Sequence, residues 1–555
     1  MFLVGVVLAS RIVAADPPEW LEPCPPFKIA GNLYWVGSKD LASYLIATPQ
    51  GCILINSSLQ PSVPLIQASV EQLGFKFSDI KILLISHAHW DHDAGSARIK
   101  ELTGATYMVM EPDVSVVESG GRTDFHYGSF PGSLYPPAKV DRVLHDGDEV
   151  KLGDTVLVAH LTAGHTPGCT TWTMKVTEGD RTYNAVIVGS PNVNEGFDLV
   201  ANKRYPQIAD DYARGFAVLK SLPCDLFLGA HGAYFGMLAK RTRLKPGAAN
   251  PFVDPEGYRS FVAEREQAFR AELAKQQAAV FAGLEKQGRL IVAPFASAPF
   301  PHPARAEGHP YEGKLYSAAE HYADSRVAIF IPQGFRETGS VDFVVHFHGW
   351  RNTVAGTLET FHLAEQLVAS GKNAILVVPE GPRDAPDSFG GKLEDAGGFQ
   401  RFMDEVVATL RARAGFKRPD FSVGRIILSG HSGGYHVMAG ILDRGGLDRN
   451  IAEVWLFDAL YGQTGSFVAW AQRSPGRLID LYTDHGGTKE ETEKLITHLR
   501  AQDTTILQAE EAQLAPRELE GRHYVFIHTD LTHNEVLDKR GQFTRFLQTS
   551  RLADR

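Results

Sequence analysis

The sequence predicts an α/β protein of two domains, each built on its own sheet. Short apolar runs alternate with amphipathic stretches of helical period along the 555 residues, which is typical of sheets covered by helices. Four prolines fall within residues 294–303, and neither a helix nor a central strand accommodates such a run. At roughly 150 residues per domain, the length also allows two to four domains. We therefore predict domains at residues 16–280 and 316–555, joined by a Pro-rich linker at 281–315.

The composition excludes several classes of protein. Hydrophobic residues make up 44% of the chain and charged residues 22%, so a largely disordered protein is excluded. The formal net charge of −10 argues against a nucleic-acid partner or a polybasic membrane-binding surface. No apolar run approaches the ~18 residues that a membrane-spanning helix needs. The composition favours no particular oligomeric state.

The N-terminal residues have the pattern of an export signal. Residues 1–10 are almost all apolar, and residues 13–15 offer the small side chains that signal peptidases favour. We expect residues 1–15 to be a signal peptide and the mature protein to be periplasmic or secreted. The alternative is that this segment forms a buried N-terminal strand.

The chain contains four cysteines without a CxxC pair, so a cysteine zinc site is not expected. In an exported protein, Cys24 and Cys52 could form a disulfide that ties the N-terminal segment to the first sheet. The alternative is four unpaired buried cysteines, which behave as small hydrophobic residues.

The elements of the first domain follow from hydrophobic periodicity. Helical patterns occur at residues 63–73 and 208–222, and an amphipathic, well-charged stretch from 254 to about 277 predicts a closing helix. Strands are expected at residues 33–36, 43–47, 52–56, 81–86, 106–110, 156–160, 185–189 and 225–230.

In the second domain the apolar runs are nearly continuous, as expected of parallel strands buried on both faces. A doubly wound sheet is therefore predicted, with a helix at residues 435–442. Its strands are expected at residues 327–331, 342–347, 374–378, 425–429, 453–457, 478–482 and 524–528.

A cluster of potential metal ligands follows the predicted strand at 81–86. His87, His89, Asp91 and His92 lie within six residues, too many adjacent polar groups for a satisfied core cluster. Two further histidines follow predicted strands among glycines: His165 in Ala-Gly-His-Thr-Pro-Gly and His231 in Gly-Ala-His-Gly. Imidazole and carboxylate ligands favour zinc, and five histidines with one aspartate suffice for two zinc ions that share a water.

This pattern, HxHxDH followed by two single histidines, resembles the metallo-β-lactamase superfamily over about residues 20–278. The resemblance implies an αββα sandwich with two Zn²⁺ at one edge. It also implies which residues hold each ion. The first ion would be held by His87, His89 and His165, and the second by Asp91, His92 and His231.

Position 190 bears on the subclass. Superfamily members that act as lactonases or thioesterases carry a bridging aspartate at the end of the strand where this chain has Ser190. Ser190 together with an intact His87 resembles the third subclass of class B β-lactamases, and so does the motif around His165. Cys24 and Cys52 match a disulfide found in some members. A zinc lactonase or thioesterase on the same fold remains the alternative.

The resemblance implies hydrolysis of the β-lactam amide bond, an antibiotic-resistance activity on a small-molecule substrate. The attacking group would be a hydroxide shared by the two zinc ions, since zinc lowers the pKa of bound water to about 7. Asp91 would orient this hydroxide and handle its proton. Ser190 and Asn194 would contact the substrate; each could instead be a polar residue that caps a loop.

The second domain contains a different pattern, Gly430-x-Ser432-x-Gly434, directly after the predicted strand at 425–429. Such a strand–turn–helix presents a nucleophilic serine. His533 follows the last predicted strand, and Gly349 in Phe-His-Gly-Trp follows an earlier one, where an oxyanion-hole amide belongs.

Residues 316–550 resemble the α/β-hydrolase fold, which implies a triad in the chain order Ser, acid, His. Ser432 and His533 are two of its members, and the acid is Asp484, with Asp458 as the alternative. The sequence thus predicts a zinc β-lactamase fused to a serine hydrolase of unknown substrate. Alternatively, the second domain is a non-catalytic binding module, because a fold alone does not determine function.

Overall fold

The computed structural model describes residues 16–418, 420–501 and 505–555, and the chain divides into two compact units. The first unit ends at Leu273 and the second begins at Ala274, except that Val200–Lys203 belongs to the second. The predicted signal peptide, residues 1–15, lies outside the described residues. Within the described ranges, no helix combines the length and apolar character needed to cross a bilayer.

The first unit contains two sheets. The first sheet has seven strands in chain order and the second has five in the order β12-β11-β10-β9-β8. The strands of the first sheet are β1 (Phe27–Ala30), β2 (Leu33–Trp35), β3 (Tyr44–Thr48), β4 (Gly51–Ile55), β5 (Ile80–Leu84), β6 (Thr106–Met110) and β7 (Arg142–Leu144). Those of the second are β8 (Glu149–Leu152), β9 (Thr155–Leu161), β10 (Thr170–Glu178), β11 (Arg181–Val188) and β12 (Leu226–Gly229).

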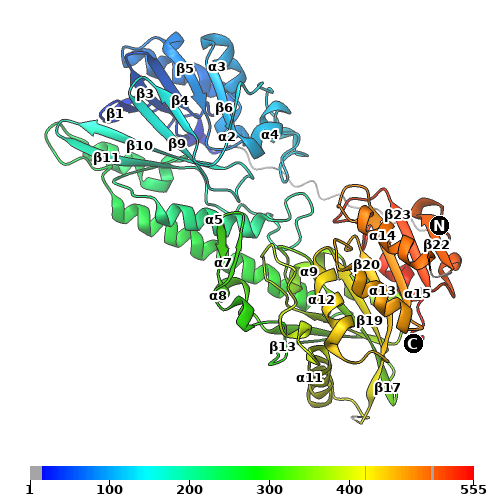
Figure 1. The fold of residues 1–555 in the computed structure, drawn as a ribbon. Helices are drawn as coiled ribbons and strands as arrows, with labels where there is room; N and C mark the ends of the chain where they lie inside the picture. The colour runs from blue at the N-terminus through cyan, green and yellow to red at the C-terminus, as the bar shows by residue number, and fades with distance from the viewer. Residues whose placement is uncertain (1–15, 419, 502–504) are drawn as a thin grey trace, which may run out of the picture. The chain divides into compact units, whose positions relative to one another are not determined.

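Helices cover the outer faces of these two sheets (Figure 1). One apolar cluster, which includes Trp35 and Trp172, fills the space between the sheets and extends to α5 and α7. A second cluster lies between the first sheet and the helices α1 and α3. The predicted αββα sandwich is therefore confirmed for the first unit. Its helices are α1 (Val63–Gln72), α2 (Trp90–Asp93), α3 (Ser96–Thr103), α4 (Val114–Glu118), α5 (Ile208–Ser221), α6 (Met237–Arg243) and α7 (Pro255–Leu284), the last continuing into the second unit.

The expected strands and helices of the first unit are all present, but four strands were missed: β1, β7, β8 and β10. These strands mix Lys, Arg, Glu and Thr with apolar residues. Such sequences carry a weak hydrophobic period, so their strand conformation depends on pairing with neighbours.

Of the two alternatives that the sequence leaves open for the cysteines, the structure has the unpaired one: Cys24, Cys52 and the other two cysteines are all free thiols. Cys24 belongs to the apolar cluster between the sheets, whereas Cys52 on β4 belongs to the cluster on the outer face of the first sheet. Their side chains thus pack on opposite sides of one sheet, which excludes the short sulfur–sulfur approach that a disulfide needs.

The second unit is built on a nine-stranded sheet in the order β13-β16-β18-β17-β19-β20-β21-β23-β22. All neighbours are parallel except β13 with β16 and β16 with β18. The strands are β13 (Gly288–Pro294), β16 (Arg326–Pro332), β17 (Ser340–Phe347), β18 (Ala374–Pro379), β19 (Ser422–His431), β20 (Ile451–Phe457), β21 (Arg477–Thr483), β22 (Ile506–Glu510) and β23 (Tyr524–Thr529), with a separate hairpin of β14 (His309–Tyr311) and β15 (Lys314–Tyr316).

Apolar clusters lie on both faces of this sheet. One contains side chains of α11 to α14, and the other contains side chains of α9, α10, α15 and the end of α7. The sheet is thus wound on both sides, as the continuous apolar runs predict. The helices are α8 (Ala318–His321), α9 (Val354–Thr360), α10 (Leu363–Ser370), α11 (Gly398–Arg413), α12 (Gly434–Gly440), α13 (Thr464–Arg473), α14 (Lys489–Arg500) and α15 (Gln542–Gln548).

The predicted Pro-rich linker at 281–315 is wrong, because this segment is part of the second unit. β13 pairs with β16 along its whole length, from Gly288 opposite Pro332 to Pro294 opposite Arg326. Phe300 is fully buried in a small apolar cluster of its own. Prolines are tolerated here because β13 is an edge strand and the chain leaves the sheet at Pro294.

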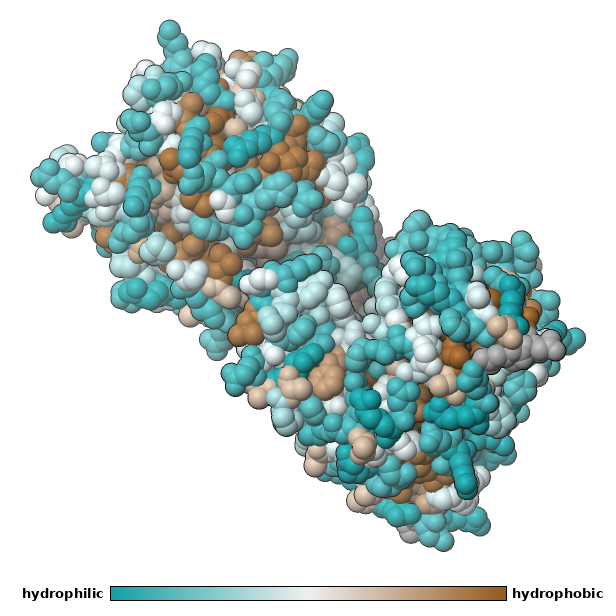
Figure 2. All heavy atoms as spheres, viewed as in Figure 1, coloured by the Kyte–Doolittle hydropathy of each residue, from teal (hydrophilic) through white to brown (hydrophobic). Residues whose placement is uncertain are grey.

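The surface agrees with the composition. On the face shown in Figure 2, hydrophilic residues predominate, and apolar residues gather in several groups between them. Exposed apolar residues are normal for a folded protein, so only their position relative to a candidate site is informative.

Candidate metal centre and serine site

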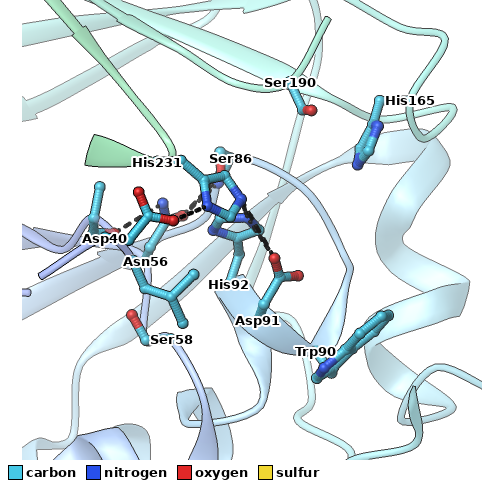
Figure 3. A network of polar contacts seen from close by, with 12 residues as sticks. Asp40, Asn56, Ser58, Ser86, Trp90, Asp91, His92, His165, Ser190 and His231 are labelled. Carbon is cyan, nitrogen blue, oxygen red and sulfur yellow. Dashed lines mark hydrogen bonds and ion pairs between the residues drawn. The ribbon is translucent and has the colours of Figure 1, made fainter. Parts of the chain in front are cut away.

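The end of β5 delivers the ligand cluster to the edge of the first sheet. The side-chain oxygen Oδ1 of Asn56 accepts hydrogen bonds from the amide of Ser86 (2.8 Å) and from its hydroxyl (3.0 Å), which holds the strand end in place (Figure 3). A helical turn, α2, begins directly after His89. Asp91 and His92 both lie on this turn.

Three of the predicted ligands meet as imidazole rings. The ring of His87 lies 4.9 Å from that of His89 and 4.7 Å from that of His165, and the latter two lie 4.7 Å apart. One nitrogen of each ring lies within 4.8 Å of the others. His165 comes from the loop between β9 and β10. His165, at least 76 positions away in the chain, is thus brought beside His87 and His89, as predicted.

The other three predicted ligands also converge. Oδ2 of Asp91 lies 3.2 Å from Nε2 of His92 and 3.4 Å from Nε2 of His231. The two imidazole nitrogens are 3.2 Å apart. Figure 3 shows these side chains directed toward one another from α2 and from the end of β12. The structure therefore brings all six predicted ligand side chains to one edge of the sandwich.

The chemistry of this cluster fits a metal. In the described structure, both ring nitrogens of His87 and Nδ1 of His92 are buried without a hydrogen-bond partner. Buried polar atoms without partners are costly, so these nitrogens need a ligand. Two overlapping groups have donor atoms within 4.8 Å of one another, the first of three histidines and the second of His87, Asp91 and His92. Nitrogen and carboxylate donors suit zinc.

The electrostatics favour metal binding at two of the proposed ligands, His87 and His165. Burial lowers the pKa of His165 to about 3 and that of His87 well below its usual value. Both imidazoles are therefore neutral at neutral pH, the form that binds a metal. Burial also disfavours the charged form of His231, but Asp40 and Asp91 outweigh it and raise the pKa to about 9.

Sequence reasoning missed the residues that orient the ligands. Asp40 accepts a hydrogen bond from Nδ1 of His231 at 2.9 Å, which turns Nε2 toward Asp91 and His92. Asp113 accepts bonds from the amide of Ala88 (3.0 Å) and from the amide of Gly168 (2.8 Å) and so connects two ligand loops. Each is a single acid far from the ligands in the chain, so spacing does not identify it.

We expect Asp40→Asn to lower zinc affinity and zinc-dependent turnover by roughly 10- to 100-fold, the usual cost of losing such a partner. The amide side chain no longer fixes the His231 tautomer as a carboxylate does. Zinc titration and steady-state kinetics measure the two effects. Asp154→Asn, a loop change in the same unit, is the control, and an equal loss in both variants would contradict a specific role for Asp40.

The two predicted substrate contacts lie near this cluster. Ser190 is 3% exposed, and its hydroxyl shares a hydrogen bond of 3.1 Å with Tyr234. Asn194 donates a hydrogen bond of 2.9 Å to the hydroxyl of Tyr127. The ring of Tyr127 lies 5.0 Å from that of His89. Asn194 thus adjoins the ligand cluster through an aromatic side chain.

In the second unit, β17, β19, β20, β21 and β23 run parallel, so the loops after them gather at one edge. Ser432 follows β19 directly and has a φ of 53°, in the left-handed region that is rare for non-glycine residues. Gly349 packs so closely that a Cβ atom on it would lie 2.4 Å from Cβ of Ser432. This is the tight turn that the Gly-x-Ser-x-Gly pattern predicts.

The choice of Asp484 as the acid beside His533 is wrong, because the alternative, Asp458, takes that place. Nδ1 of His533 donates a hydrogen bond of 2.6 Å to Oδ2 of Asp458, which is fully buried. Asp484 instead lies 2.6 Å from Lys489 and 3.0 Å from His528, with its side chain 46% exposed. β20 is the direct neighbour of β19 and β21 is one strand further, so the loop after β20 is closer to Ser432.

The Asp458 carboxylate is held in its ionised form. Burial raises its pKa, but hydrogen bonds from His533, Thr488 and Thr483 outweigh this and lower the pKa below the usual value. An ionised carboxylate at this position fixes the imidazole so that Nε2 is its free basic nitrogen.

The loop after β17 is fixed by a buried pair. His348 donates from Nδ1 to the carbonyl oxygen of Gly349 (2.9 Å), and its Nε2 lies 3.1 Å from Glu380. In a trans peptide the N–H points opposite to the C=O, so the amide that follows this carbonyl points away from His348. The loop beside Ser432 therefore has a defined peptide orientation.

Comparison with known proteins supports the first unit's family. The profile of the metallo-beta-lactamase superfamily matches residues 41–177. The native FEZ-1 metallo-beta-lactamase from Legionella gormanii is 56% identical, over 46% of this chain and 98% of its own, with a TM-score of 0.46. BJP-1, a subclass B3 metallo-beta-lactamase of Bradyrhizobium japonicum, is 39% identical over 47% and 98%, with a TM-score of 0.45. LRA-12, a class B3 di-zinc metallo-beta-lactamase from an Alaskan soil metagenome, is 37% identical over 46% and 97%, with a TM-score of 0.44.

A curated protein of Burkholderia pseudomallei (strain 1710b), named "Probable metallo-hydrolase", is 30% identical over 118 residues, or 21% of this chain. The match spans 37% of that protein's length. The three solved structures are each matched over nearly their whole length, at 37–56% identity, by less than half of this chain.

Proposed function

The chain belongs to the metallo-beta-lactamase superfamily through its first unit, and from this premise we propose that this unit is a di-zinc enzyme that hydrolyses the amide bond of β-lactams. The observation that carries the proposal is the convergence of five histidines and Asp91 at one edge of the sandwich. The identity of 56% over 98% of FEZ-1, whose name states this activity, supports it. Ser190, in place of a bridging aspartate, favours a lactamase over a lactonase or thioesterase.

The proposed ligands of the first ion are His87, His89 and His165, and those of the second are Asp91, His92 and His231. Zinc, when bound by these residues, would supply Lewis acidity toward the lactam carbonyl and make a water molecule acidic enough to ionise near neutral pH. The chain's own side chains would orient the reacting groups and transfer the proton.

Asp91 would act on the proton. Its Oδ2 faces His92 and His231, and its second oxygen, Oδ1, would accept the proton of the attacking water and pass it to the lactam nitrogen as the ring opens. Asn194 and Ser190 would contact the substrate carboxylate or carbonyl. Asn194 adjoins the ligands through Tyr127, which supports this assignment.

The test is hydrolysis of nitrocefin by the full chain with and without a chelator. We expect turnover that a chelator abolishes and that added zinc restores, with two zinc ions per chain by elemental analysis. Hydrolysis of a lactone or thioester but not of nitrocefin would identify the alternative instead. Export is also proposed, on the pattern of residues 1–15, and with it a role in antibiotic resistance; cell fractionation tests the location.

A second function is proposed for the second unit, favoured by the hydrogen bond of 2.6 Å between His533 and Asp458. We propose an α/β-hydrolase fold in which Ser432 attacks an ester carbonyl while Nε2 of His533 takes its proton. Asp458 would hold the imidazole, and the amides of Gly433 and of the Gly349 loop would bind the oxyanion. If Ser432 does not react with a fluorophosphonate probe, the unit is instead a binding module.

A further inference from the structure

Two exposed aromatic side chains lie beside Ser432. Among the large apolar side chains that are exposed in the described part of the chain, only two are aromatic: Trp350, which is 42% exposed, and Tyr461, which is 37% exposed. The others are leucines and valines. Aromatic side chains usually bury most of their surface, so their exposure next to a reactive serine needs an explanation. We call these two residues the aromatic pair.

Trp350 is fixed on the oxyanion side of Ser432. It follows Gly349, whose backbone packs closely against the Ser432 side chain. A Cβ atom on Gly433 would lie 2.8 Å from Cδ1 of its indole, so the ring rests on the backbone of Gly433. Its Nε1 donates a hydrogen bond of 2.7 Å to Ser388, and the ring of Tyr311 lies 5.3 Å away at 77°.

Tyr461 is fixed on the histidine side. It follows Asp458 by three positions on the same loop, and its ring lies 6.3 Å from that of His533. Its hydroxyl lies near the Ser432 side chain. The ring of Tyr435 lies 6.0 Å away. Trp350 is thus held by a hydrogen bond and a neighbouring ring, and Tyr461 by two neighbouring rings, while part of each remains open to solvent.

We propose that the aromatic pair binds a planar ring of the substrate, so that the second unit acts on esters of aromatic acids. This inference rests on the proposed serine-hydrolase function. Fixed aromatic faces bind a ring at low entropic cost, because their conformation is already ordered. Such ring contacts add to the free energy gained from apolar burial.

The polar atoms near the pair favour an aromatic ring over a sugar. Nε1 of Trp350 donates to Ser388, and the nearby carboxylate of Asp387 is paired with Arg305 at 2.6 Å. A sugar ring would bury hydroxyl groups that need partners of their own. An aromatic ring has no hydroxyl groups that need hydrogen-bond partners, so it suits a site whose nearby polar side chains are already paired.

The reaction balances as an ester hydrolysis. Oγ of Ser432 forms a bond to the carbonyl carbon of the aromatic ester, and the bond from that carbon to the alcohol oxygen breaks. The serine proton passes through Nε2 of His533 to the departing alcohol. Water then cleaves the acyl-enzyme, which releases the aromatic acid and restores Ser432.

The test compares the full chain with three variants on methyl cinnamate, methyl hexanoate and a sugar acetate. We expect the wild type to prefer cinnamate. Trp350→Ala and Tyr461→Leu should each lower kcat/KM for cinnamate by roughly 2- to 10-fold relative to hexanoate, the size of a ring–ring contact. Tyr461→Phe keeps the ring and should keep this preference. Leu315→Ala, which removes another exposed apolar side chain of the unit, is the matched control and should change nothing.

The outcomes separate this inference from the function on which it rests. Labelling of Ser432 by a fluorophosphonate, together with equal losses on cinnamate and hexanoate, would overturn the aromatic specificity alone. A wild-type preference for the sugar acetate, reduced by the same substitutions, would also overturn it and assign a carbohydrate ester. Absence of both labelling and ester turnover would overturn the serine-hydrolase function and the aromatic specificity together.

Discussion

Replacing Ser432 with alanine is expected to abolish ester hydrolysis by the full chain, a loss of at least roughly 1,000-fold in turnover. No other group would replace the nucleophile, because in the proposed mechanism His533 and its partner Asp458 act only through the serine proton. Nitrocefin hydrolysis should remain unchanged, since the six ligand side chains all belong to the first unit. The measurement is turnover of a short-chain ester and of nitrocefin by wild type and Ser432→Ala, each with and without a chelator.

The chelator and a second serine substitution serve as controls in the same experiment. Chelation should stop lactam hydrolysis and leave ester hydrolysis intact, the reverse of the substitution. Ser466→Ala, a change of a half-buried serine in α13 of the same unit, controls for general effects on folding. If either treatment removed both activities, the two sites would not be independent. Replacing Asp484 should have little effect, whereas replacing Asp458 should lower ester turnover.

Replacing His87 with alanine is expected to lower nitrocefin turnover by more than the roughly 10- to 100-fold that loss of an outer hydrogen-bond partner costs. His87 belongs to both groups of converging donors, so its removal disturbs both proposed ion sites. His231→Ala should affect the second ion alone and leave about one zinc per chain. Elemental analysis of the purified variants and nitrocefin kinetics measure these effects.

The matched control is His145→Ala, because this histidine is in the same unit but its side chain is 68% exposed. It should keep the wild-type zinc content and activity. A zinc content of zero in the wild type after purification with added metal would contradict the proposed centre. Equal zinc content in wild type and His87→Ala would contradict the ligand assignment.

Much of the first unit's site could be predicted because its signals are local. His87, His89, Asp91 and His92 lie within six residues after an apolar strand, and His165 and His231 each follow a strand among glycines. In the structure these positions converge as expected. Short-range spacing was sufficient here because strand ends in one sandwich meet at a common edge.

The partners of these ligands could not be predicted in the same way. Asp40 lies 191 positions from His231, and Asp113 connects Ala88 with Gly168. A single carboxylate carries no spacing signal, and its role depends on which loops pack together. The cysteines illustrate the same point, because pairing of Cys24 with Cys52 depends on which side of the sheet each side chain occupies.

The sequence by itself determined the two α/β units, the ligand types of the metal centre, and the serine and histidine of the second site. Each of these is indicated by a local pattern of neighbouring residues. Only the tertiary structure decided that β13 belongs to the second sheet and that Asp458 rather than Asp484 faces His533. The physical reason is the order of strands. β20 lies beside β19 and β21 does not, so the hydrogen-bonded neighbours in the sheet, and not the sequence, determine which carboxylate reaches the imidazole.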